Sequence, residues 1–106
     1  MPAYLVAKVA VHDPETYLKY AARTPALIAR HGGRFLTRGT PVTTLEGMPF
    51  NDRMVIVEFP SAAHAEALFK DPEYDDAAMF RRGASVAQIV VQDGVAAGGG
   101  APDPQV

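Results

Sequence analysis

A nearly continuous, valine-rich apolar run from Ala3 to Val11 is the feature that most constrains the fold. Such a run is typical of a central β-strand that is buried on both faces. Asp13-Pro14-Glu15 follows, and each residue suits a helix start: an acceptor for free amides, a proline for the first helical position, and a carboxylate near the positive end of the dipole. The sequence therefore predicts a strand followed at once by a helix that begins at Pro14.

The first helix contains a proline that we expect to interrupt it. Apolar residues recur at close to the helical period and predict an inward stripe made of Leu18, Ala21, Pro25 and Ile28. Pro25 has no amide to bond back to Ala21, so we expect a kink or break near Thr24. Gly32-Gly33 is predicted to end the helix, because glycine adopts the left-handed conformation at little steric cost.

The remaining chain predicts three more strands and two more helices. The strands are expected at Arg34–Arg38, with an extended continuation over Val42–Leu45, at Arg53–Phe59 and at Val86–Gln92. The helices are expected to start after a cap at Ser61 and at Pro72, and Gly83 is expected to release the chain into the last strand. With right-handed crossovers this order gives an α+β, ferredoxin-like βαββαβ fold, with one antiparallel sheet and helices on one face.

The chain is expected to form one domain with a tail. Residues 1–95 are enough to fold alone as a ferredoxin-like domain. Residues 96–106 are rich in glycine and proline and poor in large apolar side chains, so we expect this C-terminal tail to lie outside the domain.

Both faces of the predicted sheet are mostly apolar, which a lone subunit would leave partly in water. Residues two apart in a strand share a face. In the first strand the one charged side chain is Lys8, and in the third strand Arg53 and Glu58 lie on different faces. We therefore expect a homodimer in which the helix-free faces of two sheets cover each other. The alternative is that the tail or a long loop covers the sheet.

Several short motifs add a family resemblance to this interpretation. They are Asp13-Pro14-Glu15-x-Tyr17, His31-Gly32-Gly33-Arg34, Leu45-Glu46-Gly47, Val57-Glu58-Phe59-Pro60-Ser61 and Pro72-Glu73-Tyr74. In these motifs and their order, the chain from Ala3 to Val95 resembles the family called domain of unknown function 1330. The resemblance implies a ferredoxin-like subunit of a dimeric α/β barrel, and it implies no particular reaction.

Composition excludes several classes of function. A formal net charge of −2 provides no broad cationic surface for nucleic acid. No apolar run approaches the ~20 residues that span a bilayer, so we expect no membrane insertion. Cysteine is absent, which fits a reducing compartment, and we expect the cytoplasm. The three histidines are too scattered to predict a metal site.

The candidate ligand-binding residues are polar side chains near the predicted sheet and first helix: Lys8, Tyr17, His31, Arg34, Arg53 and Glu58. Charged side chains on neighbouring strands are costly to bury unless they pair or meet a ligand. The structural alternatives are a cross-strand ion pair between Lys8 and Glu58, solvated arginines, and a tyrosine that packs at the core edge. For His31 the alternative is a cation that complements the helix C-terminus.

Three functions agree with these residues. The first is a homodimer that binds a small aromatic or carboxylate molecule in a cleft between sheet and helices, with cofactor-independent proton transfer as the chemistry if it is an enzyme. The second is a non-catalytic structural or stress-related dimer. The third is a monooxygenase-like enzyme with haem, for which only His12, His31 and His64 could be axial ligands. The sequence itself predicts no cofactor.

Overall fold

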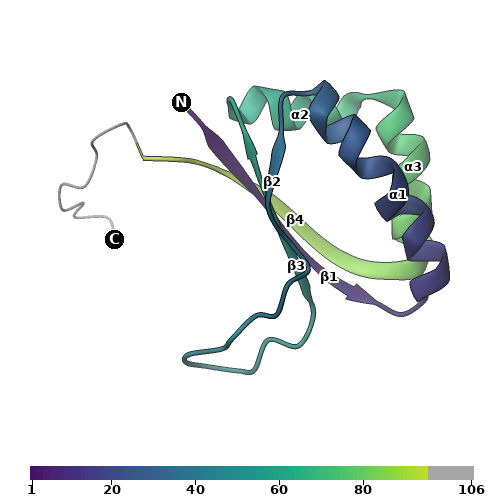
Figure 1. Cartoon of the computed structure of the whole chain (residues 1–106), viewed down its shortest axis with the longest axis vertical. Coiled ribbons are helices and arrows are strands. Elements are labelled where there is room, and N and C mark those ends of the chain that lie inside the picture. The colour runs from purple at the N-terminus through teal and green to yellow at the C-terminus, as the bar shows by residue number, and fades with distance from the viewer. Residues whose placement is uncertain (96–106) are drawn as a thin grey trace.

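The computed structural model describes residues 1–95 and contains four strands and three helices (Figure 1). In chain order they are β1 (Ala3–Val11), α1 (Pro14–Arg30), β2 (Arg34–Arg38), β3 (Arg53–Phe59), α2 (Ala62–Lys70), α3 (Pro72–Ala84) and β4 (Ser85–Asp93). The predicted tail, residues 96–106, lies outside the described residues. Among the helices of the described part, none combines the length and the apolar character that a bilayer crossing requires.

The strands form one antiparallel sheet in the order β2-β3-β1-β4. The valine-rich β1 is central, as predicted, and pairs with β3 on one side and with β4 on the other. Figure 1 shows all three helices on the same face of this sheet. The arrangement confirms the ferredoxin-like βαββαβ prediction, with the consecutive helices α2 and α3 in the place of the second helix.

The core fills the space between the sheet and the helices. Alternate residues of the two middle strands point to the helices and are buried, namely Leu5, Ala7, Val9, Val55, Val57 and Phe59. The helices add Tyr17, Leu27, Ile28, Ala65, Leu68, Tyr74, Ala77 and Ala78. The strand alternation read from the sequence groups these strand residues on one face, and the position of the helices makes that face the core.

Each helix begins at the capping residue that the sequence predicted. Asp13 Oδ1 and Ser61 Oγ each accept a hydrogen bond from the amide three residues further on, at 3.3 and 3.4 Å. Asp71 Oδ1 accepts one from the amide two residues further on, at 2.9 Å. These bonds satisfy amides that have no partner inside the helix, so local sequence encodes all three starts.

The predicted break in the first helix does not occur, because α1 runs continuously from Pro14 to Arg30 with Pro25 inside it. A kink near Thr24 stays a prediction. Proline at this position leaves the carbonyl of Ala21 without its usual amide partner. That carbonyl instead accepts hydrogen bonds from Thr24 Oγ1, at 3.1 Å, and from Arg38 Nη2. Side-chain donors thus replace the lost backbone bond, and the helix continues.

The inward face of α1 also differs from the predicted stripe. Leu18 is 64% exposed and Pro25 points to solvent, whereas Tyr17, Thr24 and Leu27 are buried together with the predicted Ile28. The helix is rotated so that two polar residues face the sheet. The apolar period could not predict this rotation, because the polar atoms lie where the interior contains hydrogen-bond partners and a cavity.

Two further boundaries differ from the prediction. Val42–Leu45 belongs to the irregular loop between β2 and β3 and does not extend a strand. α3 continues through Gly83 to Ala84, whose carbonyl accepts hydrogen bonds from the amides of His12 and Asp13 at 2.9 and 3.1 Å. A contact distant in sequence therefore fixes the end of α3, and β4 extends one residue beyond the prediction at each end.

The helix-free face of the sheet, which we call the open face, is not covered by the long loop. Figure 1 shows the loop projecting away from the body of the molecule, and its residues Leu45 and Met48 are 93% and 91% exposed. Val86 and Val90 of β4 are also exposed large apolar residues. Of the two predicted intramolecular covers, the loop is excluded, and the tail lies beyond the described residues.

Candidate ligand-binding site

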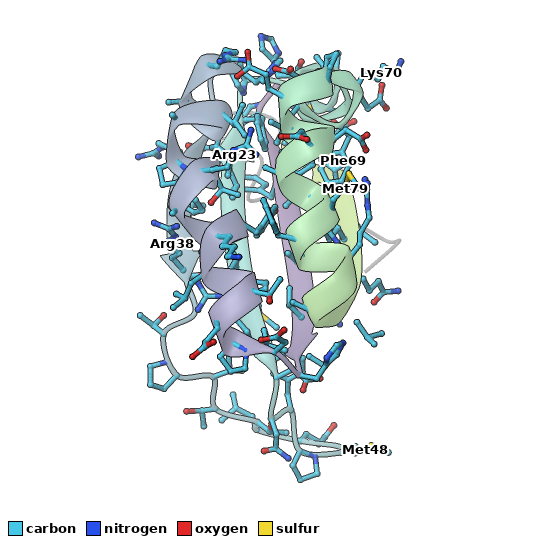
Figure 2. The ribbon with its side chains drawn as sticks, turned by 90° about the vertical axis from the view of Figure 1, so that its right-hand side faces the viewer. Arg23, Arg38, Met48, Phe69, Lys70 and Met79 are labelled. Atoms are coloured by element: carbon cyan, nitrogen blue, oxygen red, sulfur yellow. The ribbon has the colours of Figure 1, made fainter. Side chains whose placement is uncertain are left out.

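A cavity of about 40 Å³ lies between the helices and the sheet. At roughly 10–15 Å³ for each water, this volume holds about three water molecules. Its floor is apolar and comes from β1 and β3, and Figure 2 looks onto the helices α1 and α3 that cover it. The polar side chains that line it are Tyr17, Tyr20, Thr24, Arg38, Arg53, Tyr74 and Arg81.

Three arginines from three different elements reach this cavity: Arg38 at the end of β2, Arg53 at the start of β3, and Arg81 in the last turn of α3. None of the three forms an ion pair with a carboxylate within residues 1–95. The described residues that line the cavity include no aspartate, glutamate or histidine. Arg81 and the buried Nε of Arg53 therefore carry positive charge that no carboxylate of the described chain pairs with, in surroundings that screen charge poorly, whereas Arg38 is exposed.

Arg53 was a sequence candidate, and its position is fixed by two neighbours. Its guanidinium carbon lies 5.7 Å from the centroid of the Tyr17 ring, within the range of a cation–π contact. Its other neighbour is Gly39, which has a φ of +75° and where a Cβ atom would overlap the guanidinium. Arg53 Nε is buried and has no hydrogen-bond partner in the described chain.

Arg81 was not identified from the sequence, although it is the most buried of the three arginines. It is only 7% exposed, its Nε also has no partner in the described residues, and its guanidinium lies 5.4 Å from the Tyr20 ring centroid. A basic residue in a last helical turn is usually explained by the helix dipole. The helical period could have identified it, because Arg81 shares one face of α3 with Tyr74 and Ala77, and all three are buried.

Arg38 connects the cavity to the proline-containing helix. Its Nη2 donates to the Ala21 carbonyl and lies 3.5 Å from Thr24 Oγ1. Its guanidinium also lies 4.6 Å from the Phe35 ring centroid. Figure 2 shows Arg38 on the α1 side of the molecule, where its side chain is exposed. Of the three arginines, Arg38 is therefore the exposed one, whereas Arg81 is buried.

Besides the arginines, a pair of tyrosines in the cavity lining provides an uncharged hydrogen-bond donor. The hydroxyls of Tyr20 and Tyr74 lie 2.8 Å apart, and either can be the donor. One proton of the pair makes this bond, so the accepting hydroxyl keeps its own proton for another acceptor. Burial, followed by the proximity of Tyr74, raises the pKa of Tyr20 far above its ordinary value. The Tyr20 hydroxyl is therefore neutral at physiological pH.

The lining of the cavity supplies hydrogen-bond donors and positive charge from its arginines and tyrosines. Guanidinium groups donate charge-assisted hydrogen bonds to carboxylate, phenolate or enolate oxygens, and the aromatic and aliphatic walls suit a planar or apolar body. The carboxylate or imidazole expected to transfer a proton in the cleft does not line the cavity of one chain. Residues 1–95 also contain no group of three or more acidic or histidine side chains arranged to hold a metal ion.

The structure divides the six sequence candidates between separate places. Tyr17 and Arg53 line the cavity. Lys8, Arg34 and Glu58 lie on the open face, so they do not share the predicted cleft between sheet and helices. The ion pair that forms there joins Arg34 Nε to Glu58 Oε2 at 2.5 Å. Lys8 instead pairs in register with Met54 and Gln88, four residues along β1 from the rung that contains Glu58.

His31, the sixth candidate, lies at the end of α1 and outside the cavity. Its Nε2 lies 2.8 Å from Asp71 Oδ2, the residue that separates α2 from α3. His64 bonds to Ser61 through Nδ1 at 2.7 Å, and His12 is exposed. Because no histidine lines the cavity, the hypothesis of a histidine-ligated haem finds no ligand there.

The layers and the cavity define a ferredoxin-like α/β protein with an internal site suited to a small molecule. More particularly, the chain belongs to the family described as domain of unknown function (DUF1330), whose model matches residues 2–95. This match confirms the resemblance seen in the sequence motifs. Among curated proteins, none matches the chain.

Solved structures show the same fold in proteins of low identity. The RPA0582 protein of unknown function from Rhodopseudomonas palustris is 23% identical, with a TM-score of 0.72 over 89% of this chain and 82% of that one. SnoaB, a cofactor-independent oxygenase from Streptomyces nogalater, is 20% identical, with a TM-score of 0.65 over 88% and 92%. A protein from Caulobacter crescentus proposed to be an antibiotic biosynthesis monooxygenase is 15% identical, with a TM-score of 0.57 over 89% and 90%.

Proposed function

We propose that the protein binds a small organic anion in the cavity between its sheet and helices. The observation that carries this proposal is the set of three arginines without carboxylate partners in the described chain, two of which have a buried, unpaired Nε. A buried donor without an acceptor costs free energy. A bound carboxylate, phenolate or enolate would supply the acceptor and the opposite charge, and the tyrosines would contact its apolar body.

The experiment compares an arginine of the cavity with its neighbour on the same helix. Binding of aromatic carboxylates, phenols and lactones is measured by calorimetry, with the amides of the same acids as neutral matches. Arg81→Met should weaken binding of the carboxylates by about ten- to a hundredfold, since a hydrogen bond to a charged group contributes ~1.5–3 kcal/mol. The variant should fold, because it replaces an unpaired buried cation by an apolar side chain of similar length.

Arg82→Met is the matched control. Arg82 lies outside the cavity and pairs with Asp75 at 2.8 Å on the exposed side of α3. Its loss should leave binding unchanged. Equal affinity for acids and amides, or equal losses in Arg81→Met and Arg82→Met, would show that the cavity does not recognise an anion.

A cofactor-independent oxygenase is the second candidate function. Its support is the fold shared with SnoaB, together with arginines that would bind the oxygen of an acidic phenol as its anion. Oxygen consumption after addition of a phenol that binds, measured in wild type and in Arg81→Met, tests it. A bound phenol that consumes no oxygen leaves a binding protein, and failure of every anion to bind would favour the non-catalytic dimer.

The working unit that we propose is a homodimer formed through the open face. Thr37, Ile56, Val6 and Val90 form one rung across the four strands on this face. An apolar sheet surface of this kind is shielded when a second sheet packs against it. A cytoplasmic location stays a prediction from the absence of cysteine.

A further inference from the structure

A second hollow lies beside the arginine cavity. It is a groove of about 160 Å³ between α2 and β4, lined mainly by apolar side chains of these two elements. Among the described residues that line it, Glu66 is the one charged side chain. The groove is therefore suited to apolar groups, with a negative charge at its margin.

The cavity and the groove are neighbours that share part of their walls. Leu5, Phe69 and Ile89 line both of them. Of these shared residues, Phe69 is 37% exposed and Ile89 is half-buried, so neither is locked in the core. Figure 2 shows Arg38 on the α1 side of the molecule and Phe69 on the α3 side.

The charged side chains are divided between the two hollows. The arginines line the cavity, and Glu66 lines the groove. Arg53 pairs in register with Val9, and Leu5 lies four residues earlier on the same strand. At ~3.3 Å for each residue of a strand, the backbone of Arg53 lies about 13 Å along the sheet from the rung of Leu5, one of the shared wall residues. The cavity itself has room for about three waters, which is enough for a charged group and little more. The groove has four times the volume of the cavity, 160 against 40 Å³.

We infer that the ligand is an amphipathic anion, with its acidic group at the arginines and an apolar chain or ring that passes Phe69 into the groove between α2 and β4. This inference rests on the proposed function, because it assigns the position of the acidic group to the arginine cavity. Glu66 sets the orientation, since it opposes an anionic group at the far end and tolerates an apolar one.

The test is a series of phenyl-substituted straight-chain carboxylic acids of increasing length, measured by calorimetry on the full chain. Each added methylene should tighten binding by about two- to fourfold until the groove is full, because each transfers apolar surface out of water. Val91→Phe fills the groove from β4 and should abolish this gain while leaving the shortest acid within twofold of wild type. Met79→Phe, an exposed change on α3 outside both hollows, is the control and should keep the full gain.

A surface variant decides the question if Val91→Phe does not fold. Glu66 is exposed, and Glu66→Lys should strengthen binding of a long acid with a second carboxylate at its far end by tenfold or more, with no effect on the shortest monoacid. If short acids bind but length and Glu66→Lys have no effect, the extended-ligand inference is wrong and the proposed function stands. If no acid in the series binds, the proposed function and this inference fail together.

Discussion

At the scale of single residues, the site depends on glycine as much as on arginine. Gly39 follows β2 directly and contacts the guanidinium of Arg53, which in turn packs beside the Tyr17 ring. A side chain at position 39 would have to share space with the end of a flexible arginine. Gly39 is therefore a positioning residue, because it leaves room for Arg53 at the cavity.

A substitution at Gly39, compared with a control, distinguishes the effect of backbone strain on stability from the effect of a displaced Arg53 on binding. Gly39→Ala should destabilise the fold by about 1–2 kcal/mol, the cost of a left-handed non-glycine residue, and should also weaken anion binding because Arg53 is displaced. Gly47→Ala is the control, since Gly47 has a φ of +90° but no atom near its missing Cβ. Urea unfolding and calorimetry should show similar stability losses in both variants and a binding loss only in Gly39→Ala. A binding loss of equal size in Gly47→Ala would contradict this role.

At the scale of elements, one carboxylate joins three helices. Asp71 ends α2, caps α3 through the Glu73 amide at 2.9 Å, and contacts His31 and Arg30 from the end of α1 at 2.8 and 3.2 Å. The hydrogen bond from His31, the backbone bond and the pairing with Arg30 lower the pKa of Asp71 below its ordinary value of 3.8. The charged carboxylate is therefore favoured by folding.

The lowered pKa of Asp71 makes the stability of the fold depend on pH. Because the pKa is lower in the folded state, the contribution to stability is complete above about pH 4 and is lost as the pH falls through the folded value. Asp71→Asn keeps a capping side chain but carries no titrating charge, so the unfolding midpoint in urea should fall less steeply below pH 4 than in wild type. His31→Gln should have a smaller effect in the same direction. Parallel pH profiles for wild type and Asp71→Asn would contradict this assignment.

At the scale of the whole molecule, the open face separates a dimer from a lone subunit. Val90 lies on this face of β4 and is 50% exposed, whereas Met79 is 64% exposed on the outer side of α3. Val90→Asp should convert the proposed dimer to a monomer in sedimentation velocity at micromolar concentration, because a charge would be buried in an apolar interface. Met79→Asp should leave the dimer intact. A wild-type protein that sediments as a monomer would show that the open face has another role.

Strands, helix starts and the two-residue alternation within each strand were predictable because they depend on neighbours in the sequence. The alternation of β1 and β3 and the caps Asp13, Ser61 and Asp71 act within a few residues, and the structure confirms them. Of the six site candidates, Tyr17 and Arg53 reach the cavity. Tyr17 lay outside the inward stripe predicted for the first helix, and the sequence did not show that Arg53 would be on the face of the sheet that the helices cover.

Only the tertiary structure decided which polar groups meet. Arg38, Arg53 and Arg81 come from β2, β3 and α3, and their convergence depends on how the helices cross the sheet. The continuity of α1 past Pro25 likewise depends on Thr24 and on Arg38, which belongs to another element. Sequence periodicity reports whether a residue prefers water or the interior. It does not report which distant partner will satisfy a donor, because the hydrogen bonds and charges of a site are formed between elements whose positions are set by packing of the whole core.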